Sequence, residues 1–304
     1  MQIYLPIAEM SVNALVLLGM GSVIGFLSGM FGVGGGFLLT PFLIFIGIPP
    51  AVAVGTQANQ LLAASVSGVL AHWRRGNVDV HLGAVMLVGG ALGSLLGVVL
   101  FNVLQRLGQI DLVISLCYVF LLGTIGLMMF VESIKTIYRG RLGVVPRKTQ
   151  RLSRWRHLPF KMRFQRSKLY ISALTPGGIG FVGGVLVAVM GIGGGFLLVP
   201  AMIYILEMPI ALVAGTSLFQ IAFTTAVTTV LQAVTNRTVD FVLALLLVIG
   251  SVIGAQLGSQ AAGRLRPEVA RALLALLVLM VVVKLAIDLV ATPEERYAIS
   301  TSLS

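Results

Sequence analysis

Two short stretches of the sequence could bind an anion, although neither contains a charged side chain. Residues 32–41 read GVGGGFLLTP and residues 191–200 read GIGGGFLLVP, so the copies differ at only two of ten positions. Each Gly costs a helix about 1 kcal/mol relative to Ala, and three adjacent Gly residues favour a break in the helix. A helix that begins after such a break presents free N–H groups and a partial positive charge, which attract anions.

Neutral polar side chains accompany each glycine cluster in otherwise apolar sequence. Thr56 and Gln60 are four residues apart, as are Thr216 and Gln220, so each pair shares one helix face. We therefore predict that backbone N–H groups, hydroxyls and amides hold the anion between the two clusters. The predicted substrate-binding residues are Gly34, Gly35, Gly36, Thr40, Thr56, Asn59, Gln60, Gly193, Gly194, Gly195, Thr216, Ser217 and Gln220.

The sequence does not favour an enzyme. Catalysis needs an acid, base, nucleophile or metal cluster at one depth, and we identify no such group of residues. The lone Cys117 supplies neither a disulfide framework nor a metal cluster. No Lys-Ser or Lys-Thr pair follows the glycines, which argues against a nucleotide-binding loop. We expect no catalytic residue, no metal and no cofactor.

The composition predicts an all-α integral membrane protein. Hydrophobic residues make up 58% of the 304 residues, charged residues make up only 10%, and the mean hydropathy is +1.03. A soluble domain usually carries about 25% charged residues. Residues 10–71 contain no charged side chain. Several apolar stretches reach about 20 residues, which is long enough to cross a bilayer as a helix.

The glycine clusters belong to a longer internal repeat. We predict transmembrane repeat 1 over residues 1–134, a basic cytoplasmic linker over 135–172 and transmembrane repeat 2 over 173–304. The segment after the first cluster, 36–48, would reach only about 20 Å as a helix, too short to cross alone. Each repeat is therefore expected to hold three spanning helices plus a broken or re-entrant pair at GxGGG, giving 8–10 transmembrane segments.

The charge distribution indicates how the repeats are oriented. Eleven Lys or Arg and no acidic residue lie between Arg139 and Lys168, which predicts a cytoplasmic segment. Corresponding loops of the two repeats carry opposite charge bias, so we predict inverted-topology repeats with both termini periplasmic. The net charge of +11 then needs no nucleic acid, because the basic segment can face anionic lipid head groups. We expect RLSRWRHL and FKMRFQRSKLYI to form a short surface-lying helix.

Other polar and glycine positions have structural explanations. Asp79 and Asp240 precede apolar helices and are most simply N-caps, with a role in gating left open. The glycine-rich stretches 89–97 and 250–258 are expected to let helices pack closely. A homodimer through these faces is also left open.

The motifs resemble the sulfite exporter TauE/SafE family. The resemblance rests on GFLSGMFGVGGGFLLTPFL, on PPAVAVGTQANQ and on the second copies GIGGGFLLVP and AGTSLFQ. It implies a multi-pass carrier of the bacterial inner membrane that exports sulfite, sulfoacetate or a related organosulfonate. Paired helix breaks in such a carrier predict a midplane site with alternating access. A passive anion channel and a carrier of a small carboxylate are the alternatives.

Overall fold

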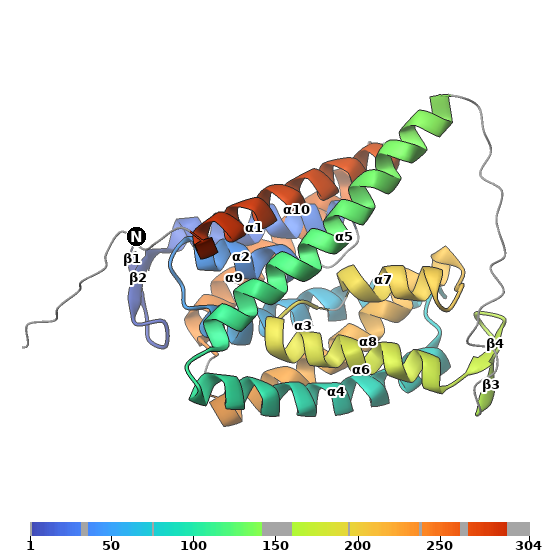
Figure 1. Cartoon of the computed structure of the whole chain (residues 1–304), viewed down its shortest axis with the longest axis horizontal. Coiled ribbons are helices and arrows are strands. Elements are labelled where there is room, and N and C mark those ends of the chain that lie inside the picture. Colours follow the sequence, from blue (N-terminus) through green and yellow to red (C-terminus); the bar gives the residue numbers. More distant parts are fainter. Residues whose placement is uncertain are drawn as a thin grey trace, which may run out of the picture.

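The computed structural model describes residues 2–31, 36–74, 76–141, 160–193, 195–236, 239–261 and 267–290. It is mostly helical, which confirms the predicted all-α class (Figure 1). Ten α-helices lie in this described part: α1 Ala14–Phe31, α2 Gly36–Phe45, α3 Pro50–Arg74, α4 Val80–Arg106, α5 Ile110–Arg141, α6 Leu174–Met190, α7 Gly195–Tyr204, α8 Ile210–Leu231, α9 Phe241–Ala261 and α10 Pro267–Val290. A π-helical turn, Gln232–Asn236, continues α8.

Five helical segments of the described chain are long and apolar enough to cross a membrane. They are Val80–Arg106, Ile110–Lys135, Leu212–Asn236, Phe241–Gly258 and Ala272–Val290. Four further apolar helical segments, in α1, α2, α6 and α7, are shorter. The short segments are those that adjoin the glycine clusters, so the chain combines full-length spans with pairs of shorter helices.

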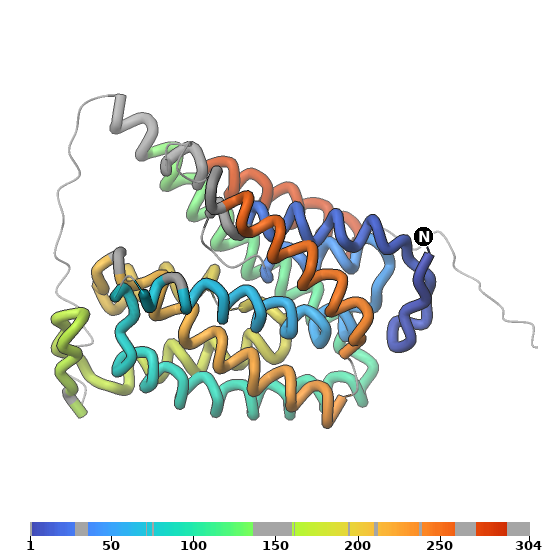
Figure 2. The backbone as a smooth tube through the Cα atoms, turned by 180° about the vertical axis from the view of Figure 1, so that it is seen from behind, coloured from blue at the N-terminus to red at the C-terminus, as the bar shows by residue number. Residues whose placement is uncertain are grey.

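The helices of the first half, α1 to α5, pack mainly against those of the second half, α6 to α10. Helix α1 packs along α9 and α4 packs along α6, while α3 contacts α8 and α5 contacts α10 (Figures 1 and 2). In chain order, α1 corresponds to α6 and α4 to α9. The α3–α8 and α5–α10 contacts therefore join equivalent helices of the two halves. The α1–α9 contact has the α4–α6 contact as its counterpart, with the two halves exchanged.

Glycines allow the α4–α6 and α1–α9 pairs to approach closely. A Cβ atom on Gly93 would overlap the Phe181 backbone, and one on Gly254 would overlap the Ser22 backbone. Within the same two stretches, a Cβ atom would come within 3.0 Å of the facing helix's backbone at Gly89, Gly97, Gly250 and Gly258. The prediction that these stretches serve close helix packing is confirmed. These glycines face helices of the same chain.

Two β-hairpins lie at opposite ends of the helical bundle (Figure 1). The first pairs β1 Gln2–Leu5 with β2 Met10–Asn13, and the second pairs β3 Lys161–Phe164 with β4 Leu169–Ser172, both antiparallel. The surface-lying helix expected over 160–171 is therefore wrong. Apolar residues alternate with basic ones here, and a period of two suits a strand that buries Phe164 and exposes Arg163. RLSRWRHL lies outside the described residues.

Candidate functional site

The two shortest helices begin at the last glycine of each GxGGG cluster. Helices α2 and α7 have ten residues each, about 15 Å, and start at the buried Gly36 and Gly195. Helix α6 ends at Met190, and Gly191 takes a left-handed φ of 67° that suits glycine. Residues 191–193 are not helical. The predicted site residues Gly34, Gly35 and Gly194 lie outside the described residues.

The starts of α2 and α7 lie next to each other. A Cβ atom on Gly36 would lie 3.3 Å from the Gly193 backbone nitrogen. One residue further along each helix, the rings of Phe37 and Phe196 stack with centroids 4.5 Å apart and planes 20° apart. These two phenylalanines occupy the same place in the two copies of the repeated sequence. The N-terminal ends of α2 and α7 therefore meet inside the protein, where backbone N–H groups from both can face one small volume.

Two side chains from the middle of α3 fill the space between these helix starts. Leu61 is buried and lies so close that a Cβ atom on either Gly36 or Gly193 would overlap it. Gln57, one turn earlier and fully buried, donates its side-chain amide to the Gly36 carbonyl oxygen. The junction of the two glycine clusters is therefore closed by one apolar and one neutral polar side chain.

Three buried glutamine side-chain oxygens have no hydrogen-bond partner among the described residues. They are the Oε1 atoms of Gln57, Gln60 and Gln220. The amide nitrogen of Gln220, by contrast, donates to the Thr224 hydroxyl at 2.9 Å. An unsatisfied buried polar atom costs about 1–3 kcal/mol, so these amides are suited to exchanging hydrogen bonds with water or with a polar ligand. These amides are neutral hydrogen-bonding groups, the kind that the sequence predicts for the anion site.

Two of the predicted hydroxyls join the two halves. Thr56 accepts a hydrogen bond from the Asp240 backbone N–H at 2.9 Å, and Thr216 accepts one from the Asp79 backbone N–H at 3.0 Å. Each hydrogen bond is the counterpart of the other, with the two halves of the chain exchanged. Both threonines are fully buried. Their hydroxyls therefore bond to the starts of α9 and α4.

The remaining predicted residues occupy separate places along α2, α3 and α8. Thr40 is fully buried beside Tyr118, whose hydroxyl donates to the Met190 carbonyl oxygen at 2.6 Å. Ser217 is buried and donates to the Ala214 carbonyl oxygen at 3.0 Å, within its own helix. Asn59 is half-buried on α3.

Asp79 and Asp240 are buried N-caps, as predicted. The Oδ1 of Asp79 accepts from the Leu82 N–H at 3.2 Å at the start of α4. The Oδ1 of Asp240 accepts from the Val242 and Leu243 N–H groups at 3.1 Å at the start of α9. An Asp in this position satisfies helix N–H groups that otherwise lack partners. Its negative charge also complements the helix dipole.

Each of these carboxylates also accepts hydrogen bonds from a hairpin that is distant in the sequence. The Oδ2 of Asp79 accepts from the Ser167 N–H at 3.0 Å and from the Ser167 hydroxyl, in the turn between β3 and β4. The Oδ2 of Asp240 accepts from the Ile7 N–H at 3.0 Å, in the turn between β1 and β2. The geometry therefore links each hairpin through an aspartate to a threonine of the predicted site.

Sequence reasoning did not assign Gln57, Leu61, Phe37 or Phe196 to the site. The phenylalanines carried a signal, because they are identical and equivalent in both copies of GGGFLL. Gln57 and Leu61 carried no comparable signal. Gln57 corresponds to Ser217 in the second copy, and Leu61 has the character of an ordinary apolar residue of a membrane helix.

Comparison with known proteins places the chain among membrane transporters. The family described as sulfite exporter TauE/SafE matches residues 17–285. A probable membrane transporter protein, YjnA, of Bacillus subtilis (strain 168) is 30% identical over 199 residues, covering 66% of this chain and 71% of the relative. A probable membrane transporter protein of Xylella fastidiosa (strain Temecula1) is 30% identical over 213 residues, covering 69% and 70%.

A plant protein is similar to a shorter part of the chain. The sulfite exporter TauE/SafE family protein 1 of Arabidopsis thaliana is 30% identical over 103 residues, covering 34% of this chain and 23% of that protein. No solved structure matches the chain. The family match spans both glycine clusters and all the predicted site residues. The chain belongs to the sulfite exporter TauE/SafE family of membrane transporters and is a multi-pass membrane protein.

Proposed function

We propose that this protein is a secondary transporter that exports a small sulfur-containing anion across the bacterial inner membrane. The family description names sulfite, and the resemblance of the motifs widens the proposed substrate class to sulfoacetate or a related organosulfonate. The anion binds near the midplane, between the helix starts at the two GxGGG clusters. Movement of one repeat against the other then gives alternating access to the two sides.

The observation that carries the proposal is the meeting of the α2 and α7 N-terminal ends. Gly36 and Gly193 come into contact, and the stacked Phe37 and Phe196 hold the two helix starts in place. Helix N-termini supply N–H donors and partial positive charge, which suit an oxyanion without requiring a Lys or Arg at membrane depth. The partnerless Gln57 amide oxygen adds a polar group at the same junction.

The proposed site lies between two inverted repeats. The exchange of contacts supports this, because α1 packs on α9 as α4 packs on α6. The hairpins at opposite ends of the bundle support it too (Figure 1). In the proposed orientation both termini are periplasmic, and the basic segment 135–172, which includes hairpin β3–β4, is cytoplasmic.

Leu61 favours a carrier over a passive channel. Its side chain fills the junction of the two glycine clusters, so an anion can occupy that junction only after Leu61 or the helix starts move. A movement coupled to binding is what alternating access requires. A passive anion channel and a carrier of a small carboxylate remain the competing functions, and the same experiment separates them.

Counterflow in proteoliposomes tests the proposal. Vesicles containing the full chain are preloaded with unlabelled sulfite or sulfoacetate, and uptake of the labelled anion is measured. A carrier gives uptake stimulated by the preload, whereas a channel gives none. Preloading with acetate reports on the carboxylate alternative.

A matched pair of glycine variants locates the site in the same assay. Gly193→Ala introduces a methyl group where Leu61 lies, and we expect it to lower counterflow at least tenfold. Gly19→Ala is the control, because a Cβ atom there meets nothing within 4 Å. Equal counterflow in the two variants would show that the glycine junction is not the anion-binding site. Absence of trans-stimulation in the unmodified protein would remove the carrier assignment.

A further inference from the structure

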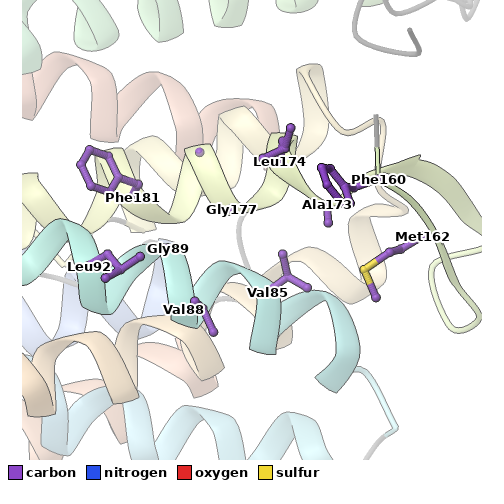
Figure 3. Close-up of a pocket in the computed structure, with 11 residues that line it drawn as sticks. Val85, Val88, Gly89, Leu92, Phe160, Met162, Ala173, Leu174, Gly177 and Phe181 are labelled. Carbon is purple, nitrogen blue, oxygen red and sulfur yellow. The ribbon is translucent and has the colours of Figure 1, made fainter. Parts of the chain in front are cut away.

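An open apolar groove of about 690 Å³ runs between α4 and α6 and ends at hairpin β3–β4 (Figure 3). Its walls carry large apolar side chains, among them Val88, Leu92, Leu174, Phe181, Phe160 and Met162. Several of these are exposed at the protein surface, including Phe160 at 76%. An apolar groove on the outer face of a pair of membrane helices has the shape and chemistry of a binding site for an acyl chain.

The groove is deep because glycines form its floor. Gly89 and Gly177 lie at the α4–α6 crossing, where a Cβ atom on Gly89 would overlap the Gly177 carbonyl group. Gly178 also lines the groove, and a Cβ atom built on it meets nothing within 4 Å. A side chain at position 178 would therefore project into the open groove without disturbing the packing of the two helices.

One end of the groove is strongly basic. Lys161 and Arg163 flank the groove residue Met162 in β3, and Arg166 and Lys168 follow in the turn. Residues 160–172 contain no Asp or Glu. The side chains of Arg163, Arg166 and Lys168 are exposed, so their charges are available at the surface. Each such charge near a membrane surface attracts an anionic head group by about 1 kcal/mol, or about fivefold in affinity.

The equivalent hairpin in the first half lacks this charge. Residues 1–13 contain no Lys or Arg and carry Glu9. Helices α1 and α9 cross through glycines as α4 and α6 do, so the two ends of the protein share a backbone arrangement and differ in charge. The basic charge beside the groove is therefore present at the β3–β4 end of the protein and not in the β1–β2 hairpin.

We propose that the α4–α6 groove is a binding site for an anionic phospholipid. One acyl chain lies between α4 and α6 over the glycine floor, and the phosphate head group lies at the β3–β4 end, where the exposed basic side chains of the hairpin, Arg163, Arg166 and Lys168, are available. The site is separate from the junction of Gly36 and Gly193, so it does not depend on the transported anion.

Lipid binding to the purified full chain tests the proposal. Native mass spectrometry in detergent measures the affinity for dioleoylphosphatidylglycerol and, as the neutral comparison, for dioleoylphosphatidylcholine. We expect one tight phosphatidylglycerol site with at least a tenfold preference over phosphatidylcholine. Equal affinity for the two lipids would overturn the proposal.

Two variants locate the lipid. Gly178→Leu fills the groove and is expected to weaken phosphatidylglycerol binding at least tenfold. Gly19→Leu, at the equivalent position of α1 and equally open, should leave binding within twofold of the unmodified protein. Retention of tight binding by Gly178→Leu would place the lipid elsewhere and refute the site.

A charge variant decides the matter if Gly178→Leu does not fold. Replacing Arg163 and Lys168 together by Gln removes two charges from exposed hairpin positions and leaves the groove intact. Phosphatidylglycerol binding should fall about 25-fold while phosphatidylcholine binding is unchanged. An unchanged phosphatidylglycerol affinity in this variant would refute the role of the hairpin.

Discussion

Leu61 should determine how well the two glycine clusters tolerate a side chain. A Cβ atom on Gly193 has its three nearest neighbours in the Leu61 side chain, all within 3 Å. Gly193→Ala therefore overpacks the junction, which costs about 1–3 kcal/mol of unfolding free energy. Leu61→Ala alone leaves a cavity and costs about 2–5 kcal/mol.

The double variant should be more stable than the two single changes imply. Leu61→Ala removes the atoms that a methyl group at position 193 would strike, so the overpacking term disappears. We expect a favourable coupling of about 1–3 kcal/mol, well above the roughly 0.3–0.5 kcal/mol scatter of independent sites. Reversible unfolding by SDS in mixed micelles gives the free energy of each variant.

A third glycine provides the control. A Cβ atom on Gly25 would strike the backbone of Ser251, far along the chain from α3 and rigidly held in α9. Leu61→Ala should leave the cost of Gly25→Ala unchanged. If the free energies of Leu61→Ala and Gly193→Ala simply add, Leu61 does not fill the junction and the structural reasoning for the site is refuted.

Two further changes test how the halves are joined. Asp240→Ala removes an N-cap and the acceptor of the Ile7 N–H, and should cost about 2–4 kcal/mol, with faster hydrogen exchange at the Ile7 amide. Unaltered exchange at Ile7 would contradict this assignment. In a double-mutant cycle, Phe37→Ala and Phe196→Ala should show a coupling of about 0.5–1.5 kcal/mol beyond their separate effects, because the rings stack. A coupling near zero would show that the two helix starts do not meet.

The parts of the fold governed by local rules could be predicted from the sequence. Asp79 and Asp240 each precede an apolar helix, and capping depends on residues within three positions. The helix-packing glycines, such as Gly93 and Gly254, recur at intervals of four and so mark one helix face. In both cases the physical cause lies within a short window of sequence.

Features that depend on distant contacts could not be predicted in the same way. Residues 160–171 have both aromatic anchors and basic charges, which suit a surface-lying helix as well as a strand. The turn of the hairpin also bonds through Ser167 to Asp79, which lies 88 residues earlier. Likewise nothing local distinguishes Leu61 from other leucines, because its importance comes from two glycines on other helices.

The reciprocal aspartate contacts have a consequence for biosynthesis. Hairpin β1–β2 is complete after residue 13, yet its Ile7 N–H must wait for Asp240, 233 residues later. Asp79 in turn waits for Ser167. A nascent first half therefore enters the membrane with one carboxylate and one hairpin turn still unmatched. The Asp79 carboxylate can be matched once Ser167 has been made, whereas the hairpin turn at Ile7 waits for Asp240, so one end of the protein can close well before the other.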